Sequence, residues 1–241
     1  GYSNTLMGGN AGRLLQSAFE NTYIGYHSGK NATGGNYNTA VGSYSLRQNT
    51  TADRCTAIGR SALINVTSGD FNTALGMSAG ESQTQGLSNV YLGYNSGTTH
   101  TSGSNCIIAG AQSQPSSATV SNEITLGNAS IGTLRCQVTS ITSLSDERDK
   151  TNIKDSNYGL NVINSLRPVT FDWNNRDESE NKGKKDVGFI AQELQKIDDE
   201  SLRLVYSENP EKLEATYGRL IPVLVKAIQE LKAEIELLKS K

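Results

Sequence analysis

The sequence predicts a mixed fold in two parts. Residues 1–144 are expected to form a parallel β-stack or β-helix, and residues 145–241 an α+β region that ends in a coiled-coil helix. Three observations lead to this prediction: a 17-residue repeat, an abrupt change in composition at Ser145, and a heptad pattern near the end of the chain. The first part holds 20 of the 24 glycines but only 6 basic and 5 acidic side chains.

The repeat is defined by eight segments of the type "NTALG". Their final glycines lie 17 residues apart, at Gly8, Gly25, Gly42, Gly59, Gly76, Gly93, Gly110 and Gly127. One short strand per unit cannot bury a core by itself, so the units must stack on one another. The residue before each glycine and the residue two positions earlier share one face of the strand. At about 4.8 Å per rung, eight units make a stack about 40 Å long.

The first position of the repeat is asparagine in five units and cysteine in two. We expect the asparagines to form a ladder of amides along the stack. Cys55 and Cys106 lie three units apart, which exceeds the roughly 7 Å limit between the Cα atoms of a disulfide, so we predict no bond between them. We interpret these two residues and Cys136 as small buried hydrophobic side chains.

The middle of the second part contains two segments with alternating or amphipathic patterns. Residues 158–174, "YGLNVINSLRPVTFDWN", predict a short helix followed by a strand with Val169, Phe171 and Trp173 on one face. Residues 184–197, "KKDVGFIAQELQKI", predict a strand that leads into an amphipathic helix. The charged residues between the two strands are interpreted as a solvated hairpin loop, not as a binding patch.

The last element is a helix that begins near Tyr217. Isoleucines recur every seven residues at heptad position a and leucines at position d: Ile221, Ile228, Ile235, Leu224, Leu231 and Leu238. Pro222 fits the first helical turn, where its missing N–H is not needed. Three heptads are poorly stable as a lone helix, so this pattern implies an oligomer.

Composition excludes several classes of partner. The net charge of -2 argues against nucleic acid as the main partner. No apolar run reaches the roughly 18 residues of a membrane span, and no signal peptide is visible. No set of residues suggests a metal or a cofactor, so we expect neither. Because the chain starts at Gly1, we interpret it as a fragment of a longer protein.

The repeats resemble those of trimeric phage fibres and of the head regions of trimeric bacterial adhesins. The resemblance covers nearly all of residues 1–144 and implies a trimeric β-repeat fibre that is exposed outside a cell or on a virion. Ile at a with Leu at d favours two strands in parallel coiled coils. We nevertheless expect three chains, because a short helix on a larger body takes its order from that body.

The second part resembles the intramolecular chaperone domain of phage tailspikes and tail fibres, grouped as peptidase family S74. The segments "SDERDK", "LRPVTFDWN", "GFIAQEL" and "YGRLIPVLVKAIQELKAEI" carry this resemblance, in the family's order. It implies a homotrimer that guides the β-fibre into register and then releases itself by cutting the chain. The implied partners are the chain itself and, through the mature fibre, a host-cell receptor or glycan. The fibre would belong to the virion, and the released domain would remain in the host cytoplasm.

The same resemblance assigns the residues of a self-cleavage site. Ser145 matches the nucleophile and Lys150 the general base of a Ser-Lys dyad, and the bond cut is Leu144–Ser145. Asp146 and Arg148 match supporting positions that orient the site or balance its charge. A lysine acts as a base when burial or nearby positive charge lowers its pKa, and Arg148 can supply such charge.

Spacing limits how the dyad can form. Five residues along a helix place two side chains about 140° apart, and five along a strand place them on opposite faces. The stretch must therefore turn, or the lysine must come from a neighbouring chain. Both histidines of the chain lie in the repeats, which argues against a Ser-His triad at Ser145.

Two other interpretations stay open. In the first, the chain is a receptor-binding fibre tip whose second part is a permanent, uncleaved trimerisation clamp. Ser145 would then only cap a helix. In the second, the S74-like domain belongs to a membrane-anchored transcription factor or another host protein that uses the cut for release. The 17-residue repeats argue against the second interpretation.

Overall fold

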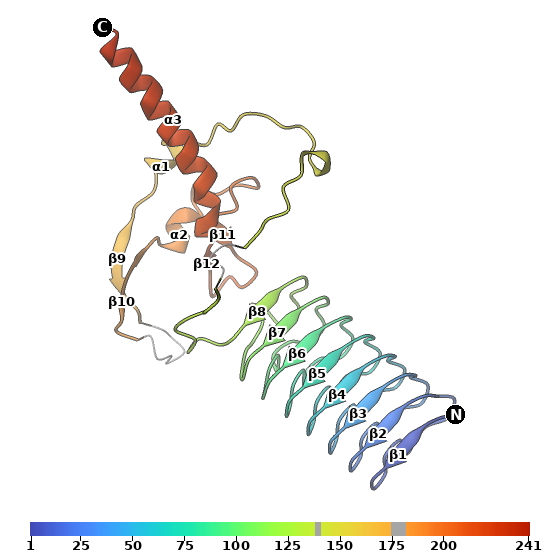
Figure 1. The fold of residues 1–241 in the computed structure, drawn as a ribbon. Helices are drawn as coiled ribbons and strands as arrows, with labels where there is room; N and C mark the ends of the chain where they lie inside the picture. Colours follow the sequence, from blue (N-terminus) through green and yellow to red (C-terminus); the bar gives the residue numbers. More distant parts are fainter. Residues whose placement is uncertain (138–140, 175–181) are drawn as a thin grey trace. The chain divides into compact units, whose positions relative to one another are not determined.

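The computed structural model describes residues 1–137, 141–174 and 182–241. The chain forms two compact units, Gly1–Ile131 and Gly132–Lys241, and each is described here by itself (Figure 1). The division that the sequence suggested, between residues 1–144 and 145–241, stays a prediction.

The first unit is a solenoid built on one eight-stranded parallel sheet. Its strands follow the chain order β1 to β8, and each pairs with the strand one repeat later, so that Thr22 lies beside Thr39. The strands are Thr5–Met7, Thr22–Ile24, Thr39–Val41, Thr56–Ile58, Thr73–Leu75, Val90–Leu92, Ile107–Ala109 and Ile124–Leu126. The predicted parallel β-stack with one rung per repeat is therefore confirmed. The number of chains in the stack stays a prediction.

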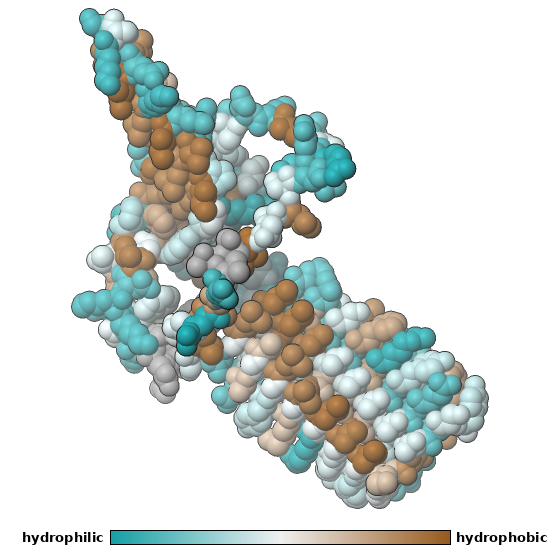
Figure 2. All heavy atoms as spheres, in the orientation of Figure 1, coloured by the Kyte–Doolittle hydropathy of each residue, from teal (hydrophilic) through white to brown (hydrophobic). Residues whose placement is uncertain are grey.

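The inner face of the sheet is formed by the middle residue of each strand. These residues are fully buried from β2 to β7: Tyr23, Ala40, Ala57, Ala74, Tyr91 and Ile108. The first and third residues of the strands share the opposite face, as alternation requires. On that face Leu75 is 51% exposed and Leu126 is 59% exposed. Figure 2 shows the result, a continuous stripe of hydrophobic side chains along the stack.

The repeating glycine allows adjacent turns to approach closely. Gly59 has a φ of +133°, which L side chains rarely adopt, and a Cβ there would lie 2.4 Å from the carbonyl oxygen of Gly76. Gly8, Gly25, Gly42, Gly76 and Gly93 make the same contact with the carbonyl group of the next repeat glycine, and at Gly110 a Cβ would lie 2.9 Å from the Cα of Gly127. No side chain fits this position, which explains why every repeat has glycine there.

The repeat asparagines bind the backbone of the next turn. The Asn38 side chain is an example: its Nδ2 donates to the Ala52 carbonyl at 2.8 Å, and its Oδ1 accepts the Cys55 N–H at 2.8 Å. Asn21 and Asn89 make the same two kinds of contact. The ladder exists, but its rungs are mostly amide-to-backbone bonds between turns, because each turn presents one carbonyl and one N–H to the amide.

The cysteines of the repeat replace asparagine as weak hydrogen-bonding groups. Cys55 Sγ donates to the Gly69 carbonyl at 3.2 Å, and Cys106 Sγ to the Val120 carbonyl at 3.4 Å. Both are free and buried, and burial raises the pKa of the Cys55 thiol to about 12. The expectation that Cys136 is buried was wrong, because it lies on the exposed segment after the last turn.

A second ladder runs along the solenoid, formed by threonine. Each hydroxyl donates to the backbone carbonyl 17 residues later, at 2.9 to 3.2 Å, from Thr33, Thr50, Thr67, Thr84 and Thr101. Threonine recurs every 17 residues at this position, so the sequence already carries the signal for this ladder.

The last turns of the solenoid enclose a buried histidine. The Tyr91 hydroxyl lies 2.7 Å from His100 Nδ1, and His100 Nε2 lies 2.9 Å from the Val120 carbonyl. A carbonyl can only accept, so Nε2 carries the proton and Nδ1 accepts from the tyrosine. Gln83 Nε2 donates to the same hydroxyl at 2.9 Å. Burial lowers the pKa of His100 below its ordinary value.

The second unit is a small α+β region. Its elements are η1 (Glu147–Asp149), α1 (Leu160–Ile163), β9 (Val169–Asp172), β10 (Lys185–Gly188), α2 (Ala191–Leu194), β11 (Val205–Tyr206), β12 (Glu214–Ala215), η2 (Tyr217–Arg219) and α3 (Leu220–Lys239). Strands β9 and β10 pair antiparallel, as do β11 and β12. The predicted order of short helix, strand, strand and helix is confirmed. Residues 175–181 of the predicted charged loop lie outside the described residues.

A compact apolar cluster holds this unit together. Its buried members are Val162, Leu194, Leu202, Leu204, Leu220 and Val223. Leu220, Val223 and Ala227 make one buried face of α3. All six predicted a and d residues lie elsewhere on the helix, and they are 45–69% exposed. The helix is therefore confirmed, and the coiled coil stays a prediction.

Candidate functional site

The stretch that contains the predicted site folds into a tight turn. Asp146 precedes the short helix η1 and caps it, because its Oδ1 accepts the Arg148 N–H at 2.9 Å. The Arg148 guanidinium also binds the Asp146 carboxylate, with nitrogen–oxygen distances of 2.6 and 3.0 Å. These hydrogen bonds from Arg148 lower the pKa of Asp146. The pair is exposed, so it shapes the local turn more than it stabilises the fold.

The turn brings Ser145 and Lys150 together. Lys150 Nζ donates to Ser145 Oγ at 2.6 Å and to the Ser145 carbonyl at 3.1 Å. Neither a regular helix nor a strand allows this contact over five residues, but the 3-10 turn of residues 147–149 does. The suggestion that Ser145 caps a helix was wrong, because Asp146 occupies the cap position.

Exposure limits what this pair can do in a single chain. All residues from 141 to 157 are exposed, and Leu144 is 99% exposed. In the contact above, the lysine donates to the hydroxyl, whereas a general base must accept its proton. A lysine becomes such a base when burial or positive neighbours lower its pKa. In a single chain, the pair is therefore an exposed hydrogen bond in which the lysine is the donor.

A charged residue of α3, Glu230, has a structural role. The Glu230 carboxylate of α3 accepts the Leu160 N–H at the start of α1, at 2.8 Å. A Cβ on Gly159 would lie 2.3 Å from that carboxylate, so glycine is required for the approach. Lys226 Nζ lies 3.7 Å from the Glu230 carboxylate. No pattern in the sequence indicated that Glu230 joins α1 to α3.

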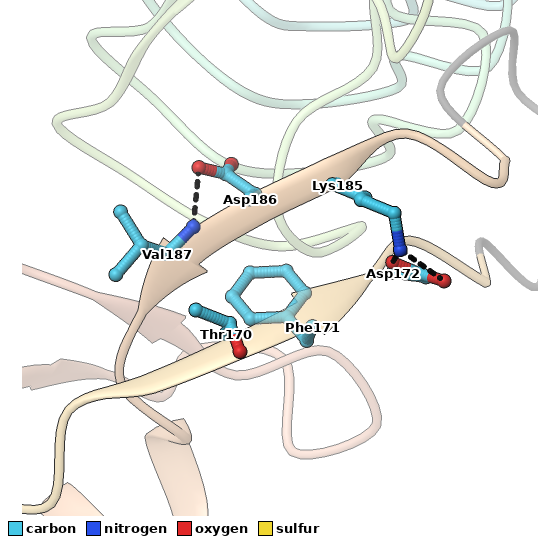
Figure 3. Close-up of a pocket in the computed structure, with 6 residues that line it drawn as sticks. All are labelled: Thr170, Phe171, Asp172, Lys185, Asp186 and Val187. Atoms are coloured by element: carbon cyan, nitrogen blue, oxygen red, sulfur yellow. Dashed lines mark hydrogen bonds and ion pairs between the residues drawn. The ribbon is translucent and has the colours of Figure 1, made fainter.

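A shallow, open pocket lies on the β9–β10 hairpin (Figure 3). It is lined by Thr170, Phe171, Asp172, Lys185, Asp186 and Val187, and Lys185 Nζ lies 3.1 Å from Asp172. Its lining combines an ion pair with one aromatic ring and holds neither Ser145 nor Lys150. The sequence predicted no site here, and the pocket shows no arrangement for nucleophilic chemistry.

The described residues contain neither a metal cluster nor a membrane-spanning helix. Within residues 1–137, 141–174 and 182–241, no three His, Cys, Asp or Glu side chains come close enough to hold a metal ion. None of the helices described is long and apolar enough to cross a membrane.

Comparison with protein families gives one match. Residues 145–203 match the model of the peptidase S74 family, described as the chaperone of endosialidase. The match begins at Ser145 and includes Lys150. Searches of curated proteins and of solved structures gave no match.

Proposed function

We propose that this chain is the C-terminal part of a phage tail fibre or tailspike, because residues 145–203 match the model of the peptidase S74 family, described as the chaperone of endosialidase. Residues 145–241 guide three copies of the solenoid into a trimer and then cut themselves off at the Leu144–Ser145 bond. The observation that supports the cut most directly is the 2.6 Å contact between Lys150 Nζ and Ser145 Oγ. The fibre stays on the virion, and residues 145–241 are left in the host cytoplasm.

The proposed reaction uses the peptide bond that precedes the nucleophile. Neutral Lys150 takes the proton of Ser145 Oγ, and the oxygen adds to the Leu144 carbonyl carbon. The C–N bond then breaks, and the lysine returns the proton to the Ser145 nitrogen. This leaves an ester between the Leu144 acyl group and Ser145 Oγ, and water hydrolyses it. Covalent connection holds the carbonyl beside the hydroxyl, which supplies a large effective concentration.

We propose that assembly of the trimer activates this reaction. The dyad is exposed in one chain, and burial by neighbouring chains would favour the neutral amine that a base needs. Cleavage would then follow correct assembly and serve as a folding checkpoint. Asp146 and Arg148 would keep the turn in place while the neighbours close over it.

Two exposed apolar surfaces support the proposed trimer. One is the outer face of the solenoid sheet, where residues such as Leu75 and Leu126 are more than half exposed (Figure 2). The other is the heptad stripe of α3, where Ile221 and Ile228 are 65% and 64% exposed. Contiguous apolar surface of this kind marks an interface between proteins. Both surfaces run along the length of their elements, as side-by-side copies require.

The test is the intact mass of the freshly expressed chain beside Ser145→Ala and Lys150→Ala variants. We expect two fragments from the parent, the second beginning at Ser145, and one full-length mass from each variant. Ser143→Ala and Lys154→Ala are matched controls, because they are exposed residues of the same types nearby, and they should be cut like the parent. A full-length mass from the parent, together with a trimeric mass in ultracentrifugation, would instead favour the permanent clamp.

A mixing experiment separates action within one chain from action between chains. Ser145→Ala and Lys150→Ala chains are unfolded, combined and refolded together. The contact within one chain leads us to expect no cut product from the mixture. A cut product would show that the lysine of one chain serves the serine of another.

A further inference from the structure

Three cations occupy one position in three consecutive turns of the solenoid. Arg13, Lys30 and Arg47 are 17 residues apart, each five residues after the repeat glycine. Adjacent turns are about 4.8 Å apart, so the three side chains form a short row along the axis of the stack. The first unit is otherwise poor in charge, with two more arginines, Arg54 and Arg60.

Three rings lie beside this row. Tyr26 stacks on His27 with ring centroids 3.8 Å apart, and Tyr44 meets both rings edge to face at 5.6 and 5.5 Å. The Arg47 guanidinium lies over the Tyr44 ring at 5.5 Å. Tyr26 is 49% exposed, so part of the ring cluster is open to solvent. We call these three rings together with the row of cations the basic corner.

The charge of the basic corner is not neutralised nearby. Within the described part of the chain, none of the three cations forms an ion pair. The pKa of His27 is lowered by burial and then by Lys30, Arg47 and Arg13, which places all three cations around one ring. Asn10 Nδ2 lies 3.1 Å from His27 Nε2. Because an amide nitrogen donates, His27 Nε2 accepts and carries no proton, so the imidazole is neutral in this contact. The row ends at Arg47, because the same repeat position is Ile64 in the next turn and Glu81 in the turn after that.

We propose that the basic corner binds an anionic polysaccharide, a polymer of sugars that carry carboxylate or sulfate groups. This inference gives a ligand class and a surface to the fibre function proposed above, and it rests on that function. Guanidinium groups bind carboxylate and sulfate through two parallel hydrogen bonds, and lysine adds a point charge. A row of cations matches a polymer with repeating anions, and the exposed tyrosine offers an apolar face and a hydroxyl to a sugar ring.

Nucleic acid fits this surface less well. Single-stranded nucleic acid binds over open ring faces and long basic grooves, whereas Tyr26 and His27 stack on each other and the cations number three. DNA binding is therefore an outcome that would contradict the proposal.

The experiment measures binding of the full chain to immobilised polymers. The probes are polygalacturonate, dextran sulfate, neutral dextran and single-stranded DNA. The test variant combines Arg13→Gln, Lys30→Gln and Arg47→Gln, and the matched control combines Arg54→Gln and Arg60→Gln, which lie at other positions of the same repeat. A second variant, Arg13→Glu, changes one exposed residue and guards against misfolding of the triple variant.

We expect the parent and the control to bind one or both anionic polysaccharides and not neutral dextran. The triple variant should bind about tenfold more weakly or worse, and Arg13→Glu should also bind more weakly. Binding should weaken as salt rises from about 50 to about 300 mM. A comparison of the affinities for polygalacturonate and dextran sulfate shows whether the basic corner prefers carboxylate or sulfate groups.

Three results would overturn the proposal: no binding to either anionic polymer, equal binding by the triple variant and the control, or tighter binding to DNA than to both polysaccharides. The intact mass of the same samples reports on self-cleavage. A parent chain that binds the polysaccharide but is not cut would therefore refute the self-cleavage alone. A parent chain that is cut but does not bind would refute the role of the basic corner alone.

Discussion

The asparagine ladder predicts a large and specific loss of stability when Asn72 is changed to alanine. This side chain is fully buried. Its Nδ2 donates to the carbonyls of Gly69 and Gly86, at 2.9 and 2.7 Å, and its Oδ1 accepts the Asn89 N–H at 3.0 Å. The Gly69 carbonyl keeps a second partner, Cys55 Sγ, at 3.2 Å.

The magnitude follows from the groups left unpaired. Among the described residues, the Gly86 carbonyl and the Asn89 N–H have no hydrogen-bond partner besides Asn72. Each buried group without a partner costs about 1–3 kcal/mol, so Asn72→Ala should lower the free energy of unfolding by about 4 kcal/mol. For a chain of this size, that corresponds to a fall in the melting temperature on the order of 10 °C.

The assay is thermal unfolding followed by circular dichroism, with hydrogen exchange measured at the Asn89 amide. Asn72→Cys is the matched control, since cysteine already fills this position at Cys55 and Cys106. We expect the thiol to recover more than half of the loss. A melting temperature of Asn72→Ala within about 2 °C of the parent, with the Asn89 amide still protected, would refute the argument.

Three more predictions concern other contacts. Gly59→Ala forces a Cβ against the Gly76 carbonyl at a strained φ and should cost about 3 kcal/mol or more, measured as loss of exchange protection in the adjacent turns. Glu230→Ala leaves the Leu160 N–H without its carboxylate and should cost about 1–2 kcal/mol in urea unfolding, whereas Glu230→Gln, which keeps an acceptor, should cost less. The lowered pKa of His100 means that the unfolded chain binds a proton more readily, so stability should fall as pH drops below about 6.5. Melting curves across that range check this, and His100→Gln should flatten the dependence.

Much of the solenoid follows from spacing alone. The 17-residue period predicted the parallel pairing, because a repeat without insertions can stack only in one register. The 17-residue period did not predict which face of each strand is buried. In "TAL", both the middle Ala74 and the flanking Leu75 are apolar, and alternation does not say which is buried. The structure places Ala74 inside and Leu75 outside, and the same inner position holds Tyr23 and Tyr91 in other turns, so side-chain size does not decide which face is buried.

The candidate site was predictable in part. Its residues came from a resemblance, and spacing showed that the stretch between Ser145 and Lys150 must turn or receive its lysine from another chain. The turn itself depends on the Asp146–Arg148 contacts, which combine a cap and a bidentate ion pair over two residues. The role of Glu230 was not predictable, because its partner Leu160 lies 70 residues away in the sequence.

The regularity of the solenoid creates an ambiguity between chains. Each turn presents nearly the same row to its surroundings: a threonine, an outward apolar side chain and a glycine, repeated every 17 residues. In the proposed trimer, one chain displaced by a whole turn would again place like residues beside like residues, and only the contacts at the two ends would be lost. The repeat thus encodes the distance between turns but not which turn of one chain belongs beside which turn of the next. That missing information must come from a non-repeating sequence, and residues 145–241 provide one.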